Sequence, residues 1–208
     1  MTAAAIATWS VPRLWPGERC FIICGGASVK DQRALVPRLE GRVIAVKQGI
    51  VLRPDADVFF VNGERNNLDQ ATSLVRYARA EHHVVRGRHV QDLPASFKRL
   101  NRHKDHTRLC DDPTRVSGYD TGTSAINLAY LLGATEIVLL GYDMTGGHWF
   151  NGELKHPLPF PPEDQFTGHM APLPALAEDC RAKGLRVVNV SPISRVACFE
   201  RGRLEDFL

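Results

Sequence analysis

The feature that most constrains the fold is a series of short, continuous apolar runs, such as CFIIC at 20–24, VIAV at 43–46 and IVLL at 137–140. A strand with one solvated face alternates apolar and polar residues, whereas these runs contain no polar residue. They are therefore expected to be strands of a parallel sheet that is buried on both faces. Segments with helical spacing stand between them, so the sequence predicts a Rossmann-like α/β fold, with a mostly parallel sheet and helices on both faces. We expect a single domain over residues 1–208.

The pattern also gives approximate positions for the elements. Strands are expected at 19–24, 42–49, 56–63, 83–87, 135–143 and 185–192, and helices at 28–41, 66–83, 122–132 and 171–184.

Two segments fit neither a helix nor a strand. Residues 86–115 are rich in Arg, Lys and His and are expected to be an irregular basic segment of loop and short helix at the surface. Residues 144–168 are rich in Gly, Pro and aromatic residues, and a loop of this length is expected to be a lid over a binding site.

Composition excludes some classes of protein. The formal net charge of +3 is too small to indicate binding to nucleic acid or to an anionic membrane. The apolar runs are much shorter than the ~20 residues that span a bilayer, and the first residues lack the features of a signal peptide. The five cysteines show no zinc-binding spacing and fit reduced thiols. We therefore expect a cytoplasmic protein without a membrane span.

A ligand is expected at the carboxyl ends of the strands, where open α/β sheets bind their ligands. The polar and glycine residues that follow the predicted strands should therefore meet at one edge of the sheet. These residues are Gly25, Gly26, Ala27, Ser28, Lys47, Gln48, Asn62, Gly63, Glu64, Gly141, Tyr142, Asp143, Asn189 and Ser191.

Two short glycine-containing segments are candidates for nucleotide binding. GGAS, residues 25–28, follows the first strand and presents backbone N–H groups and a hydroxyl suited to a phosphate. DTG, residues 120–122, begins a helix whose following strand ends at Asp143, so both ends of this unit should reach the same edge of the sheet. The simpler interpretations are a plain turn for GGAS and an N-cap for Asp120. The chain contains neither GxGxxG nor a Walker lysine motif.

His169 is the candidate for a general base. It stands just before a predicted helix, whose positive end disfavours a charged imidazole and so favours the neutral form that accepts a proton. The simpler interpretation is a histidine that caps a loop. His148 and His156, together with Glu153 and Asp143, raise the question of a metal, but their spacing matches no compact ligand pattern. The basic run at 97–108 is either a solvated face or a surface that meets phosphates.

Several blocks in a fixed order carry a resemblance to a known family. They are IICGGAS, VIAVKQG, DTGTSAINLAYLLGATEIVLLGYDM and GHMAPLPALAEDCRAKGLRVVNVSP, and together they cover most of the chain. The sequence resembles the superfamily that joins bacterial sialyltransferases of the Campylobacter type (glycosyltransferase family 42) with the DUF115, motility-accessory-factor-like proteins. It looks most like short, phage- or prophage-type members of that group.

The resemblance implies a glycosyltransferase that uses a CMP-sugar-like donor, with His169 as the general base for the acceptor hydroxyl. The acceptor would be a small molecule or a glycan, and no metal cofactor would be required. A nucleic-acid acceptor and a homo-oligomer are kept as further alternatives. The donor-binding residues that the resemblance and the strand ends indicate are Gly25, Gly26, Ser28, Lys47, Asn62, Thr121, Gly122 and Asp143.

The sequence also departs from the family pattern. Lys47 stands where the family has an asparagine, and Gly118 stands where an arginine is expected, with Arg115 the nearest candidate. The paired tyrosines that serve the donor phosphate are missing, and Thr145, His148 and Trp149 occupy that region. Two alternatives therefore stay open: a non-catalytic nucleotide-binding protein, and a Mg²⁺-dependent pyrophosphokinase acting on a hydroxymethyl heterocycle, in which acids such as Asp143 and Glu64 would hold the metal.

Overall fold

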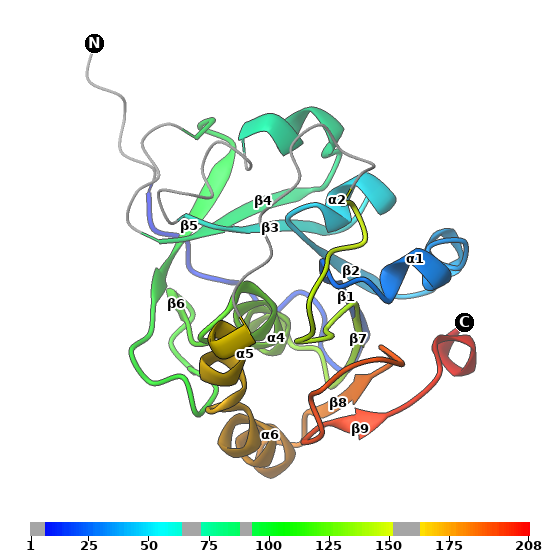
Figure 1. Cartoon of the computed structure of the whole chain (residues 1–208). Coiled ribbons are helices and arrows are strands. Elements are labelled where there is room, and N and C mark those ends of the chain that lie inside the picture. Colours follow the sequence, from blue (N-terminus) through cyan, green and yellow to red (C-terminus); the bar gives the residue numbers. More distant parts are fainter. Residues whose placement is uncertain (1–6, 64–71, 88–92, 152–162) are drawn as a thin grey trace.

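The computed structural model describes residues 7–63, 72–87, 93–151 and 163–208 (Figure 1). These residues form one nine-stranded sheet in which every neighbouring pair of strands is parallel. The predicted fold class, a Rossmann-like α/β sheet, is confirmed. The strands are β1 (Arg19–Ile23), β2 (Arg42–Val46), β3 (Val58–Asn62), β4 (His82–Arg86), β5 (Phe97–Arg102), β6 (Arg115–Val116), β7 (Glu136–Leu140), β8 (Arg186–Asn189) and β9 (Glu200–Arg201).

The strand order is β6-β5-β4-β3-β2-β1-β7-β8-β9. The chain adds β2 to β6 successively on one side of β1 and then returns to place β7 on the other side. The order of the strands therefore reverses between β1 and β7, which is the position where open α/β sheets have a crevice at their carboxyl edge.

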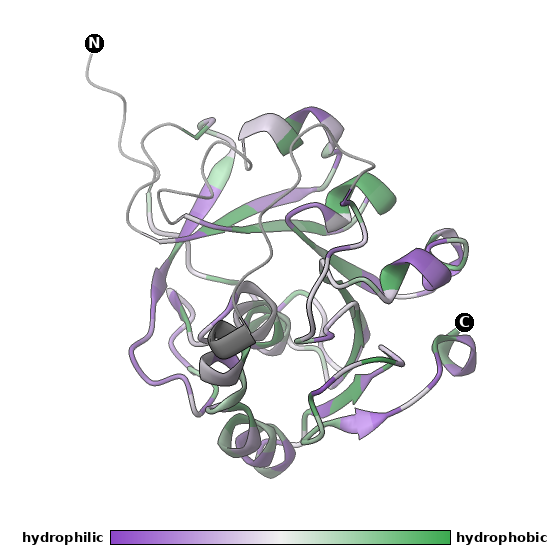
Figure 2. Ribbon diagram, viewed as in Figure 1, coloured by the Kyte–Doolittle hydropathy of each residue, from purple (hydrophilic) through white to green (hydrophobic). Residues whose placement is uncertain are grey.

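Helices and 3₁₀ turns cover both faces of the sheet. The strand side chains alternate between the two faces, so Ile22 packs in one core cluster with α4 and α6, whereas Phe21 packs in the other with the short helices. Figure 2 shows the hydrophobic strands inside this arrangement. The helical elements are α1 (Val29–Gln32), η1 (Val36–Arg38), α2 (Gly49–Leu52), η2 (Val75–Tyr77), α4 (Thr121–Leu132), α5 (Glu163–Met170), α6 (Leu173–Ala182) and η3 (Leu204–Phe207).

Helix α4 is the central crossover helix, and the sequence specifies both of its ends. Asp120 caps its first turn, accepting hydrogen bonds from the N–H groups of Gly122 (2.7 Å) and Thr123 (3.1 Å). Gly133 ends the helix with φ at 104°, which glycine adopts without strain. Because α4 packs against β1, β2 and β3, most of its side chains are buried. The predicted helix at 122–132 thus forms almost as expected.

Several predicted elements differ from the structure. Residues 28–41 form a single turn of α-helix and the 3₁₀ turn η1 rather than one helix, since Pro37 lies in the first turn of η1 and cannot continue the hydrogen bonds of a helix. The segment 86–115, expected to be irregular, contains strand β5, and only Phe97 and Leu100 of that strand are buried. Strand β5 carries too few apolar residues for its pattern to be recognised.

The expected lid at 144–168 is replaced in part by a helix. Residues 163–168 belong to α5, and residues 152–162, which include Glu153 and His156, lie outside the described part. Glu64 also lies outside it. None of the helices that the structure describes is long and apolar enough to cross a membrane. The five cysteines are all free thiols.

Candidate functional site

The turn that follows β1 and the turn that follows β7 meet at the reversal point, and we call this position the crevice because open α/β sheets bind their ligands there. Asp143, which is 2% exposed, accepts hydrogen bonds from the backbone N–H of Ser28 (2.9 Å) and from its hydroxyl (2.5 Å). The N–H of Gly26 donates to the carbonyl of Gly141 at 2.9 Å. The two turns are therefore fixed to each other through buried hydrogen bonds, and two of these bonds are made to the Asp143 carboxylate.

Gly26 is required by this close approach. A Cβ atom at position 26 would lie 2.5 Å from the carboxyl carbon of Asp143 and 2.5 Å from the carbonyl oxygen of Gly141. Within the described residues, the backbone N–H groups of Gly25 and Ala27 have no hydrogen-bond acceptor. The loop therefore presents two unused donors at the carboxyl edge of the sheet, an arrangement suited to an anion.

Residues 148–150 cover this loop. Gly26 and His148 form an isolated antiparallel bridge, and the N–H of Trp149 donates to the carbonyl of Gly25 at 3.2 Å. The His148 ring stacks on Phe150 with 4.9 Å between ring centroids, and its Nδ1 lies 3.3 Å from the carbonyl of Gly25. Because a carbonyl only accepts, this contact requires the proton of a neutral imidazole to be on Nδ1.

His148 and Lys47 are electrostatic neighbours. Burial lowers the pKa of His148, the carbonyl of Gly25 opposes this shift, and the positive charge of Lys47 lowers the pKa further. Lys47 and Met144 are the only described residues other than glycine with positive φ, at 49° and 52°. Both follow strands at the carboxyl edge, and such left-handed conformations are uncommon for these residue types and collect at functional sites.

The beginning of α4 is joined to the end of β7 by a hydrogen bond. The Tyr142 hydroxyl donates to the Asp120 carboxylate at 3.0 Å. A Cβ atom at position 122 would lie 2.7 Å from the Tyr142 ring, so Gly122 allows this ring to pack on the helix start. Burial, followed by the charge of Asp120, raises the pKa of Tyr142 well above its usual value. Thr121, the first residue of α4, is half-buried beside this contact.

Asn62 and Arg86 lie at the ends of the adjacent strands β3 and β4 and are paired in register. Both are buried. The Arg86 guanidinium donates to the carbonyl of Gly118 (2.7 Å) and to the hydroxyl of Ser124. Arg86 thus brings a positive charge to the segment before α4. In the family that the sequence resembles, an arginine is expected at the position of Gly118 in this segment.

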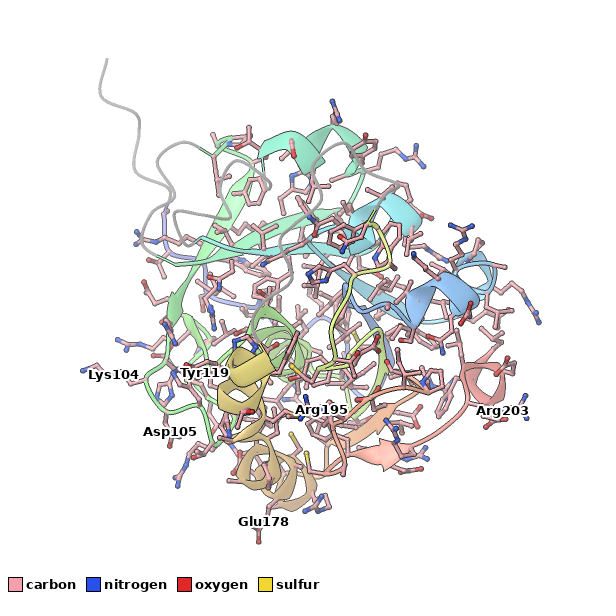
Figure 3. All side chains as sticks on the ribbon, viewed as in Figure 1. Lys104, Asp105, Tyr119, Glu178, Arg195 and Arg203 are labelled. Carbon is pink, nitrogen blue, oxygen red and sulfur yellow. The ribbon has the colours of Figure 1, made fainter. Side chains whose placement is uncertain are left out.

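His169 lies in the last turn of α5, and the next helix, α6, begins only at Leu173. The expectation that His169 stands in a loop just before a helix is therefore wrong, since it lies within α5. Its ring contacts Tyr119, with 5.2 Å between centroids, and Phe166, at 6.3 Å. Figure 3 shows Tyr119 beside α5. Tyr119 directly precedes Asp120, so His169 lies near the start of α4.

The predicted residues are thus brought together to different degrees. Gly25, Gly26, Ser28 and Asp143 are in direct contact, and all of the donor capacity of Ser28 is directed to Asp143. Lys47 is an electrostatic neighbour of this group through His148, and Gly122 approaches it through Tyr142. Asn62 and His169 lie further along the same edge, and their predicted roles, like those of the other residues, stay predictions.

Two residues in the site were not identified from the sequence as part of it. Arg86 ends the short strand β4 in a basic region, and nothing in its neighbourhood distinguishes it from a surface arginine. Tyr119 stands next to Asp120, which was selected, but a tyrosine before an acid is not a recognisable motif. In the part of the chain that is described, no three His, Cys, Asp or Glu side chains are grouped to hold a metal ion.

Comparisons with known proteins agree with the architecture. No protein-family model matches the chain, and no curated protein matches it. The fold is similar to that of the MAf glycosyltransferase from Magnetospirillum magneticum AMB-1, with a TM-score of 0.68 and 11% identity, over 96% of this chain and 35% of that chain. It is also similar to the sialyltransferase CstII from Campylobacter jejuni, solved with cytidine-5'-monophosphate, with a TM-score of 0.51 and 13% identity, over 89% of this chain and 85% of that chain.

These similarities show the fold, and they define the class to which it belongs: an α/β sheet also found in glycosyltransferases. The chain spans about a third of the length of the Magnetospirillum protein. At 11% and 13% identity, the residues of the site have to be interpreted from their own geometry.

Proposed function

We propose that this chain is a glycosyltransferase that binds a nucleotide-activated sugar, with a CMP-sugar-like donor, in the crevice between β1 and β7. The observation that carries the proposal is the glycine loop at the reversal point, where the N–H groups of Gly25 and Ala27 have no acceptor among the described residues. The fold shared with two glycosyltransferases supports this assignment. One of these was solved with cytidine-5'-monophosphate, which supports a cytidine nucleotide as the first to test.

In this proposal the donor phosphate lies over the loop at Gly25–Ser28. The two unused N–H groups would donate to it, and Lys47 would supply the opposing charge. His148 would take the place of the phosphate-binding tyrosines that the sequence lacks, since it already covers Gly25 and Gly26. Asn62, Thr121 and Gly122 would contact the nucleoside. Asp143 would act by holding Ser28 and the loop in place.

His169 is proposed as the general base. The acceptor hydroxyl would give its proton to the His169 imidazole while its oxygen forms a bond to the anomeric carbon of the donor sugar. The bond between that carbon and the phosphate oxygen would break, and the nucleotide would leave with the electron pair. Every atom is accounted for without a metal, so we expect turnover to persist in EDTA.

Nucleotide binding tests the donor half of the proposal. We expect CMP to raise the Tm of the chain in a thermal-shift titration, in preference to UMP, GMP and ATP and equally with Mg²⁺ or EDTA. The variant His148→Ala should bind CMP about 10-fold more weakly, because it loses one hydrogen bond to a charged group. Preference for ATP with strict Mg²⁺ dependence would instead support the pyrophosphokinase alternative, and binding of no nucleotide would contradict the proposal.

Turnover tests the catalytic half. With a panel of CMP-sugars, we expect His169→Gln to reduce nucleotide release by about 100-fold or more, the usual effect of losing a general base, while CMP affinity stays unchanged. Thr167→Ala is the matched control, because it changes an exposed residue on the same helix. Unchanged turnover in His169→Gln would remove His169 from the mechanism, and absence of turnover in the unmodified chain together with CMP binding would support the non-catalytic alternative.

A further inference from the structure

The turn at residues 117–120 connects β6 to α4 and presents Tyr119 to solvent, with 44% of this residue exposed. The residues at the two ends of the turn are fixed. The N–H of Ser117 donates to the side-chain oxygen of Asn127 at 2.7 Å, and Asp120 caps the first turn of α4. The tyrosine is therefore an exposed ring on a turn whose backbone is held from the interior.

A side chain from β4 also holds this turn. The carbonyl of Arg86 accepts a hydrogen bond from the N–H of Gly63 at 2.7 Å, so its backbone is part of the sheet. Its guanidinium donates to the carbonyl of Gly118 at 2.7 Å and to the hydroxyl of Ser124. The Ser124 hydroxyl in turn donates to the carbonyl of Asp120 at 2.9 Å. The residues directly before and after the exposed tyrosine are thus both connected to β4.

The chemistry of this connection requires an arginine. Arg86 is 1% exposed, and a charged side chain is rarely buried unless its hydrogen bonds are satisfied in the interior. A guanidinium reaches two acceptors from one rigid plane, which a lysine ammonium does not. The turn is also tightly closed, because Gly118 has φ at 119° and a Cβ atom there would lie 2.5 Å from the backbone nitrogen of Ser124. A change at Arg86 should therefore move the turn.

The turn is connected to the proposed general base through its tyrosine. The Tyr119 ring contacts the His169 ring with 5.2 Å between centroids and an interplanar angle of 56°, and Figure 3 shows Tyr119 beside α5. The position of one ring therefore limits the position of the other. A general base acts only within hydrogen-bond reach of its proton, and a misplacement of about 1 Å can reduce a rate about 100-fold.

We infer that Arg86 is a positioning residue for the proposed reaction. It fixes the turn at 117–120, the turn fixes the Tyr119 ring, and that ring holds the imidazole of His169 where it meets the acceptor hydroxyl. This inference rests on the proposed function, since Arg86 acts on the reaction only through His169. The simpler alternative is that Arg86 supports the fold and nothing else.

NMR of the histidine rings tests the connection without turnover. An aromatic ring shifts the resonances of protons close to its face, so the His169 signals, assigned by their loss in His169→Gln, report the position of Tyr119. We expect Arg86→Lys to shift these signals towards their values in Tyr119→Ala. Val85→Ala is the matched control, because Val85 is buried in the same strand but packs on the opposite face of the sheet. Unchanged signals in Arg86→Lys, or an equal shift in Val85→Ala, would overturn the inference.

Turnover distinguishes positioning from support of the fold. We expect Arg86→Lys to lower kcat about 10-fold and to leave CMP affinity unchanged, because Asp120 retains its cap and its bond to Tyr142. In the Tyr119→Ala background, Arg86→Lys should lower kcat less than about 2-fold, since the route from Arg86 to His169 is already broken. Effects that multiply in the double variant, or a loss of CMP affinity as large as the loss in kcat, would contradict the inference.

Ser124→Ala provides a second variant in case Arg86→Lys does not fold. It removes one acceptor of Arg86 and the bond to the carbonyl of Asp120 but keeps the buried guanidinium and its bond to Gly118. We expect the His169 signals to shift in the same direction and kcat to fall about 3-fold, the effect of one weakened positioning contact. If neither changes, the turn does not position His169.

The outcomes separate this inference from the proposed function. If the unmodified chain binds CMP and turns over, but Arg86→Lys changes neither the His169 signals nor kcat, the inference is wrong and the proposed function stands. If CMP does not bind, the proposed function fails, and the role of Arg86 in catalysis fails with it even where the His169 signals shift.

Discussion

The crevice between β1 and β7 and a cluster of rings around Tyr119 lie at the same edge of one sheet, yet different forces hold them. The crevice is fixed by hydrogen bonds between buried groups, with Asp143 2% exposed and bound to both donors of Ser28. The rings of His106, Tyr119 and His169, which we call the Tyr119 ring cluster, are held mainly by contacts between the rings, and Tyr119 is 44% exposed. A side chain that is hydrogen-bonded in the protein interior is held in one arrangement, whereas aromatic rings at the surface can repack.

This difference suits the two tasks of the proposed transferase. A donor site has to hold a phosphate and the leaving nucleotide in fixed positions, and backbone donors that are already in place do so without a further loss of conformational entropy. An acceptor site has to admit and release a second substrate, for which exposed side chains are suited. The comparison leads to three predictions about stability, and the expected effect decreases from the crevice to the Tyr119 ring cluster.

The largest effect is expected for Asp143→Ala. Removing the carboxylate leaves the N–H and the hydroxyl of Ser28 without their acceptor in a buried site, and we expect the free energy of unfolding to fall by about 3 kcal/mol. Asp143→Asn keeps the volume and one acceptor oxygen and should lose roughly half as much. Urea denaturation measures both values. A loss below about 1 kcal/mol in Asp143→Ala would mean that the two turns are not fixed by this residue.

A smaller effect is expected for Tyr142→Phe, which removes the hydrogen bond to Asp120 between β7 and α4. The loss should be about 1.5 kcal/mol at neutral pH, typical of a hydrogen bond to a charged group. Burial and the charge of Asp120 raise the pKa of Tyr142 above its usual value of 10.0. The protonated hydroxyl therefore stabilises the native state fully below about pH 10, and this contribution decreases as the pH rises above that value.

The pH dependence of the free energy of unfolding provides a control for Tyr142→Phe. Above about pH 10 the stability of the unmodified chain should fall by about 1.4 kcal/mol per pH unit more steeply than that of the variant, since only the former has this ionisable group. Buried thiols such as Cys180, whose pKa is raised mainly by burial to about 12, add an equal slope to both proteins. Parallel curves for the two proteins would contradict the assignment.

The smallest effect is expected for Tyr119→Ala. Because this ring is half-exposed and, among the residues that the structure describes, makes only ring contacts, we expect the free energy of unfolding to change by less than about 1 kcal/mol. Urea denaturation alongside Asp143→Ala gives the comparison directly. An effect as large as that of Asp143→Ala would show that the Tyr119 ring cluster supports the fold, and the contrast between the two regions would disappear.

Much of the fold follows from local sequence. Continuous apolar runs indicate strands buried on both faces, and the residues that follow those strands are the ones that meet at the carboxyl edge. Asp120 and Gly133 mark the ends of α4 because capping depends on side chains within one turn. The local hydrophobic pattern did not predict β5, because this strand has few apolar residues. It is stabilised as a strand by pairing with β4 and β6 on either side of it.

The candidate site was predictable in part. The glycine loop and Asp143 were selected because of their positions after strands, and the structure places them in contact. The bond between Ser28 and Asp143, the cover provided by His148 and the position of His169 at the end of α5 could not be inferred, because each depends on a distant segment of the chain. Arg86 is the clearest case, since its partners Gly118 and Ser124 are more than 30 residues away.

The sequence by itself determined the parallel α/β sheet and the residues that follow its strands at the carboxyl edge, because strand burial, capping and turn formation depend on residues close together in the chain. The tertiary structure alone decided which of those edge residues are engaged with one another and which have donors left for a ligand. The reason is that a hydrogen bond requires its two partners within about 3 Å, and the crossover through α4 brings the end of β7 to the end of β1.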